Sequence, residues 1–254
     1  MNTETHTVAG HSFDLPQLAT ENIQSAPSLA FMGAAAELDD FGKAARKIAD
    51  DDLLSEAGKA AKAAPLAART WQKVIDARAS LDTFAATIDQ REAALYAVPS
   101  LDDGASAVAI EDREARDWWR SLPAEGRLKM LSGLQTVGDD GEATFTRYSR
   151  LWVSLLRSPI PLPDHELAVV RDVWNSLRRI EKPSEYESIL NDRNVLTWAM
   201  RGLAHLQGIA SQATGWTLDQ VADLVAGDDA REKVAAKMGV THHQIHMAQI
   251  RKSR

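Results

Sequence analysis

Residues 74–95, VIDARASLDTFAATIDQREAAL, carry an apolar side chain at every seventh position. These positions are Val74, Leu81, Ile88 and Leu95. Ala77 and Phe84 lie between them at the spacing of a helical packing seam, and Arg91 interrupts the pattern. Because three heptads are the lower limit for a coiled coil, two alternatives remain. The seam packs against another helix of the same chain, or it forms an interface with a second chain.

The segment before this seam predicts its partner within the chain. Residues 29–64 are rich in alanine, and their apolar side chains fall on one helical stripe. Asp50, Asp51 and Asp52 predict a break and a new helix start, because aspartate caps free N–H groups. We therefore expect a helical hairpin over residues 29–98, formed by helices at 30–62 and 66–97.

The remaining chain divides at clusters of turn-forming residues. Residues 1–28 lack a helical period and predict an extended or flexible arm. Pro, Asp and Gly between 99 and 109 predict a linker. Residues 110–213 predict a multi-helix bundle, and 217–254 a C-terminal three-helix module. No segment alternates with period two, so we expect an all-α protein with almost no strand.

Composition excludes several classes of protein. The 254 residues contain no cysteine and carry a formal charge of −7, with 44% hydrophobic and 26% charged residues. The lack of cysteine excludes a disulfide scaffold, a catalytic thiol and a cysteine-ligated metal. We recognise neither a signal peptide nor a membrane-spanning segment. The expected location is therefore the cytoplasm, or a virion if a phage encodes the chain, without membrane contact.

The common catalytic motifs are missing from this chain, including phosphate-binding glycine loops, the nucleophile elbow and H-E-x-x-H. Paired aspartates stand beside glycines or at helix starts, where capping explains them. We therefore expect no enzyme activity, no cofactor and no resident metal. A catalyst assembled from residues distant in the sequence is the remaining alternative.

Adjacent tryptophans mark a candidate contact surface. The chain has seven tryptophans, and six of them follow residue 110. Trp118 and Trp119 cannot both face the same side of one helix, so we expect one to pack inward and the other to lie at a contact. With the seam, these two residues complete the predicted protein interface.

The C-terminal segment resembles the helix-turn-helix of bacterial and phage repressors. Ala235, Gly239-Val240-Thr241 and Ile245 match the recurring A-x-x-x-G-[VI]-[ST]-x-x-x-[VI] core. From residue 228 onward, six basic and three acidic residues give a charge of +3, which leaves −10 on the rest. A basic end on an acidic protein is typical of local nucleic-acid contact.

The resemblance to repressors implies which residues contact nucleic acid. They are His242, His243, Gln244 and His246 beside the groove, and Arg251, Lys252 and Arg254 at phosphates. The same module could instead pack on a protein partner. His242 and His246 also have the spacing of two metal ligands, but no third ligand is indicated nearby, so we expect no metal there.

The region 113–175 resembles small helical proteins of tailed phages and prophages, in stretches such as REARDWWRSLPAEGRLKML and LLRSPIPLPDHELAVVRDVW. This resemblance implies a role in a virion or its assembly and brings no catalytic residue with it. We therefore expect a non-enzymatic helical assembly or interaction protein with protein partners, forming a homo-oligomer or a larger assembly. The alternative is a DNA-binding protein that acts through its C-terminal module.

Overall fold

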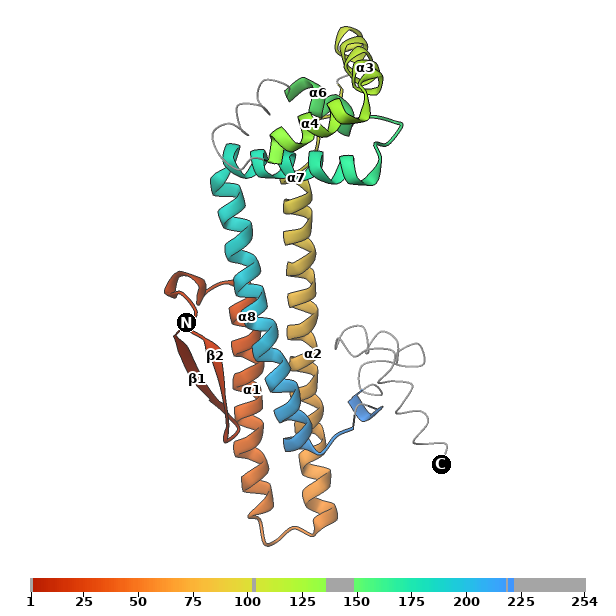
Figure 1. The fold of residues 1–254 in the computed structure, drawn as a ribbon. Coiled ribbons are helices and arrows are strands. Elements are labelled where there is room, and N and C mark those ends of the chain that lie inside the picture. The colour runs from red at the N-terminus through yellow and green to blue at the C-terminus, as the bar shows by residue number, and fades with distance from the viewer. Residues whose placement is uncertain (1, 102–103, 136–148, 218, 222–254) are drawn as a thin grey trace. The chain divides into compact units, whose positions relative to one another are not determined.

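The chain is predominantly helical, as the sequence predicts. The computed structural model describes residues 2–101, 104–135, 149–217 and 219–221. Within these ranges the only strands are β1 (Thr3–Val8) and β2 (His11–Pro16), so the all-α class is confirmed (Figure 1). A short 3₁₀ helix, η1, spans Thr20–Asn22. The α-helices are α1 (Ala26–Ala49), α2 (Glu56–Leu95), α3 (Ser106–Ser121), α4 (Ala124–Gln135), α6 (Ser149–Leu156), α7 (Asp164–Glu181) and α8 (Pro183–Thr214).

Two compact units make up the chain. Unit 2 is the segment Asp89–Leu190, and unit 1 combines the residues up to Ile88 with those from Asn191 onward. This division falls inside α2 and α8, whereas the sequence predicts a linker between 99 and 109 and a bundle over 110–213. The difference has a physical cause. The apolar face of α8 beyond Asn191 packs into the core of unit 1, and packing between distant segments leaves no local sequence signal.

The helical hairpin of unit 1 turns earlier than predicted. Residues 50–55 connect α1 to α2, and the Asp51 carboxylate accepts a hydrogen bond from the Leu53 amide. The Ser55 hydroxyl then accepts one from the amide of Gly58, which caps the start of α2. Pro65 therefore lies inside α2 and does not separate two helices. The aspartate run was the correct break signal, and the expected helix start at 66 was wrong.

The heptad seam is buried inside the chain itself. Val74, Leu81, Ile88 and Leu95 are all at most 1% exposed. Val74 and Leu81 belong to the hydrophobic core of unit 1, where α2 packs with α1, α8 and the β-hairpin. These side chains leave no free surface for a coiled coil with a second chain. The prediction that they form an interface is therefore corrected, and packing within the chain is the alternative that holds.

A β-hairpin occupies the region predicted to be an arm. β1 and β2 pair in antiparallel register from Thr3↔Pro16 to Val8↔His11. The two turn residues, Ala9 and Gly10, have φ angles of 53° and 86°, as a tight two-residue hairpin turn requires. Phe13 and other apolar side chains of the hairpin enter the core of unit 1. The prediction missed this element because its alternation is short and its burial depends on distant helices.

Unit 2 is built from shorter helices. Within it α3 packs against α6, while α7 contacts both α4 and α6. Its core consists of Trp119, Leu131, Leu151, Trp152, Leu155, Val170 and Trp174. The rings of Trp119 and Trp152 meet edge to face, with 5.6 Å between their centroids. Aromatic burial therefore holds α3 against α6.

Candidate protein-binding cleft

A cleft lies between α3, α6 and the segment at Pro99, within unit 2. Its volume is about 770 Å³. Its lining residues are Pro99, Val108, Glu111, Asp112, Glu114, Ala115, Trp118, Arg150, Leu151, Val153 and Arg157. We call this site the Trp118 cleft. Most of these side chains come from two helices that pack together, so the fold of unit 2 fixes their spacing.

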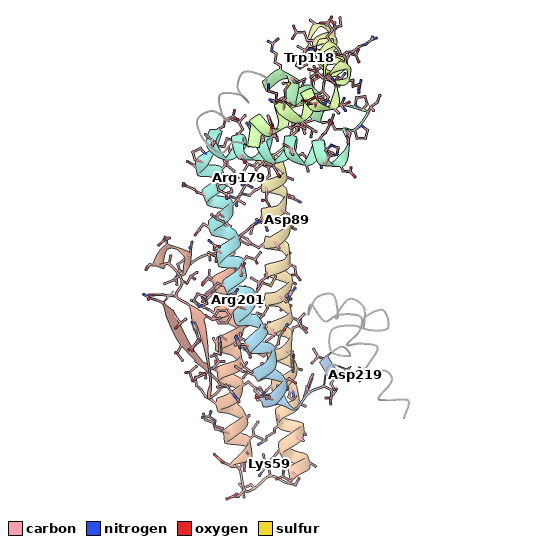
Figure 2. All side chains as sticks on the ribbon, in the orientation of Figure 1. Lys59, Asp89, Trp118, Arg179, Arg201 and Asp219 are labelled. Atoms are coloured by element: carbon pink, nitrogen blue, oxygen red, sulfur yellow. The ribbon has the colours of Figure 1, made fainter. Side chains whose placement is uncertain are left out.

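The paired tryptophans of α3 face different surroundings. Trp119 is 1% exposed, and its Nε1 donates a hydrogen bond of 3.1 Å to Oε2 of Glu166. Trp118 is 45% exposed and lines the cleft, and Figure 2 shows its position on α3. Successive helical residues point about 100° apart, so burial of one ring directs the other away from the core. One inward and one outward ring is the arrangement that the sequence predicts, but Trp119 is a core residue, so its prediction as an interface residue is corrected.

Apolar side chains form a stripe along the α3 side of the cleft. Val108, Ala115 and Trp118 follow the spacing i, i+7 and i+10, which places them on one helical face. Leu151 and Val153 of α6 provide apolar surface opposite. The Trp118 cleft therefore offers an elongated apolar floor.

Ion pairs fix the charged part of the lining. Arg157 Nη1 lies 3.1 Å from Oδ2 of Asp112, a carboxylate that is almost fully buried. The Nε of Arg157 also donates to the carbonyl oxygen of Pro99, which ties this segment to the end of α6. Nη1 of Arg150 lies 2.6 Å from Oε2 of Glu111, in a second and more exposed ion pair. Both arginines of the lining are thus already engaged by carboxylates.

Glu114 differs from the other charged residues of the lining. It is exposed and has no hydrogen bond or ion pair among the residues that the structure describes. Three carboxylates and two guanidinium groups line the cleft, so the charge left unbalanced is negative. Glu114 lies four residues before Trp118, on the same side of α3.

The cleft contains functional candidates that no sequence pattern predicts. Glu111, Asp112 and Arg150 belong to helices whose charges resemble an ordinary solvated face, and Arg157 directly follows α6. Their pairings join residues 39 and 45 positions apart, so no local pattern reveals them. The seven-residue spacing of the two arginines was the available signal, because it indicates that both lie near one face of a helix.

The other predicted site residues fall into two groups. The seam residues of α2 are core residues and do not line the cleft. The predicted nucleic-acid contacts, His242, His243, Gln244, His246, Arg251, Lys252 and Arg254, lie outside the described residues, as does most of the module at 217–254. In the part of the chain that the structure describes, no group of three or more acidic or histidine side chains could hold a metal ion.

Comparisons with protein-family models, with characterised proteins and with solved structures found no match for this chain. None of the helices in the described ranges is both long and apolar enough to span a membrane. The Trp118 cleft is therefore the feature of the described structure from which a function can be inferred.

Proposed function

We propose that this chain is a non-enzymatic interaction protein that binds a segment of a partner protein in the Trp118 cleft. The observation that carries the proposal is the half-exposed indole of Trp118 beside an apolar floor. Tryptophan is the residue type most enriched where protein interfaces gain their binding energy, especially beside a pocket. Two ion pairs between α3 and the α6 side of the lining hold the surrounding side chains in place before a partner arrives.

The dimensions of the cleft favour a polypeptide segment as its occupant. Val108 and Trp118 are ten residues apart on α3, which corresponds to about 15 Å along the helix. An apolar stripe of this length matches two to three turns of an amphipathic helix lying in a groove. The resemblance to helical phage proteins favours a structural component of the same particle as that partner.

Selection from a random twelve-residue peptide display library tests the proposal. The full chain is the bait, and recovered peptides are scored against Trp118→Ala and Leu128→Ala. Leu128 is a matched control, because it is an exposed apolar residue of unit 2 that does not line the cleft. We expect peptides whose binding falls at least tenfold with Trp118→Ala and is unchanged with Leu128→Ala, a loss that about 1.4 kcal/mol would produce.

Two results would count against the proposal. One is the recovery of no binding peptide after repeated rounds on folded protein. The other is a set of peptides that bind the Trp118→Ala variant as tightly as the original chain. Circular dichroism of both variants checks that the exposed substitutions leave the helices intact.

A second candidate function rests on the charge distribution of the sequence. The +3 charge from residue 228 onward favours contact of this end with nucleic acid. A salt-dependent mobility shift with duplex DNA, lost on combined Arg251→Ala and Lys252→Ala substitution, would support it. Absence of any shift at low salt would exclude it.

A further inference from the structure

This inference rests on the proposed function and concerns the chemistry of the partner. Four of the five charged residues that line the Trp118 cleft are paired with each other: Glu111 with Arg150, and Asp112 with Arg157. The remaining charge is the exposed carboxylate of Glu114. An acidic partner would meet this carboxylate without a free cation in the lining. A basic partner would find an unused acceptor.

Glu114 and Trp118 are spaced to hold one cation together. Residues four apart on a helix have neighbouring side chains, about 5–6 Å apart at Cβ. A guanidinium or ammonium group can therefore lie over the indole and pair with the carboxylate at the same time. Trp118 has no cation over its ring within the described part of the chain.

Elsewhere in unit 2, one arginine already contacts both a tryptophan ring and a glutamate. On α7 the guanidinium of Arg178 lies 5.6 Å from the centroid of the Trp174 ring. Its Nη1 is also 2.7 Å from Oε2 of Glu181. One arginine thus contacts a tryptophan face and a helical glutamate together. Trp118 and Glu114 present these two groups without an arginine from the residues that the structure describes.

We propose that the Trp118 cleft selects a basic amphipathic segment of a partner protein. An Arg or Lys side chain of that segment lies over the Trp118 indole and pairs with Glu114. Its apolar side chains pack along Val108 and Ala115. Arginine suits the site better than lysine, because a planar guanidinium can stack on the ring while its edge faces the carboxylate.

The peptide display library tests this inference through the composition of the recovered peptides. The original chain, Glu114→Gln and Glu125→Gln each serve as bait. Glu125 is the matched control, because it is an exposed glutamate of unit 2 that lies outside the cleft and has no ion pair among the described residues. We expect Trp118-dependent peptides to be enriched in Arg and Lys on the original chain and on Glu125→Gln. The enrichment should disappear on Glu114→Gln.

Affinities of one enriched synthetic peptide make the test quantitative. Glu114→Gln should weaken its binding about five- to tenfold, as loss of one ion pair beside an aromatic ring predicts. Glu125→Gln should change it less than twofold. Trp118-dependent peptides without an excess of basic residues would overturn the inference and leave the proposed function standing. Equal losses with both variants would also overturn it, because long-range attraction to an acidic protein would then explain the preference.

Discussion

Oε2 of Glu166 accepts a hydrogen bond from Nε1 of Trp119, and Oε1 of the same carboxylate accepts one from Nε of Arg127, at 3.1 and 3.0 Å. Glu166 is 4% exposed, so this carboxylate is a buried acceptor that joins α3, α4 and α7. The buried indole is thereby held in one orientation, and the Trp118 side of α3 turns toward the cleft. Glu166 does not line the cleft, but it contacts the helix that carries Trp118.

We expect Glu166→Ala to destabilise unit 2 by about 2–3 kcal/mol, because it leaves a buried indole N–H and a partly buried guanidinium without their acceptor. Glu166→Gln should cost less, since its carbonyl oxygen can still accept one of the two bonds. Urea unfolding followed by tryptophan fluorescence measures both. A Glu166→Ala variant as stable as the original chain would show that the buried network does not hold α3.

The second prediction concerns close packing between α1 and α8. A Cβ atom on Gly202 would lie 2.6 Å from Cε2 of Phe31, within the core of unit 1. We expect Gly202→Ala to lower stability by about 1–3 kcal/mol, the usual cost of overpacking a core. Thermal unfolding monitored at 222 nm measures the change.

Gly208 provides the control on the same helix. A Cβ there meets no atom within 4 Å. Gly208→Ala should raise stability by about 0.5–1 kcal/mol, because alanine has the higher helix propensity. Equal effects of the two substitutions would contradict the close approach of Phe31 to α8.

The third prediction concerns the attachment of the β-hairpin to α1. The Asp39 carboxylate is 2.7 Å from Nζ of Lys43 and accepts a 3.1 Å hydrogen bond from the Ala9 amide. The hydrogen bond with Lys43, followed by that from Ala9, lowers the pKa of Asp39 below its ordinary value of 3.8. A lowered pKa means that the folded state favours the ionised carboxylate. This stabilisation is present above pH 3.8 and is lost as the pH falls through the lower, folded-state pKa.

We therefore expect Asp39→Asn to reduce stability at pH 6 and to have little effect near pH 2. The loss should stay below about 1 kcal/mol, because the Asp39 side chain is 40% exposed and solvent screens the pair. Glu4→Gln, an exposed change on β1, serves as a control for general charge effects. Urea unfolding across this pH range measures the difference. If the stability difference between Asp39→Asn and the original chain stays constant with pH, the ionised carboxylate is not its cause.

The fourth prediction separates core packing from assembly at the heptad seam. Leu81 is fully buried, so Leu81→Ala should destabilise the chain by about 2–5 kcal/mol. Under conditions where the Leu81→Ala variant is folded, light scattering should give it the same molar mass as the original chain. Lys73→Ala, an exposed substitution on α2, should leave both the stability and the molar mass unchanged. A smaller assembly with Leu81→Ala would restore the alternative of a seam between chains.

Local sequence pattern was enough to predict the helical class and the main break of the long hairpin. The heptad seam predicts which face of α2 is buried, but either another helix of this chain or a second chain could bury that face. Only the burial of Val74 and Leu81 in the core of unit 1 decides between them. The β-hairpin was missed because Phe13 and Leu15 become buried only when α1 and α8 are present.

Trp118 is the only residue of the candidate site that could be predicted from the sequence. The adjacency of Trp118 and Trp119 requires that the rings diverge, which is a property of any helix. The ring that turns inward, Trp119, packs against Trp152 and donates to Glu166, 47 residues away along the chain. Arg150 and Arg157 likewise pair with Glu111 and Asp112 only because α3 packs on α6, which leaves Glu114 without an ion pair among the described residues. Such contacts between distant residues carry no periodic signal.

Fluorine NMR of the chain labelled with 5-fluorotryptophan tests the central proposal most directly. Single Trp→Phe substitutions assign the resonances, and a peptide recovered by display selection is then titrated in. We predict that the Trp118 resonance shifts most, and that those of the buried Trp119 and Trp152 move little. Saturable binding of the peptide without any change at the Trp118 resonance would contradict the proposal that this cleft is the binding site.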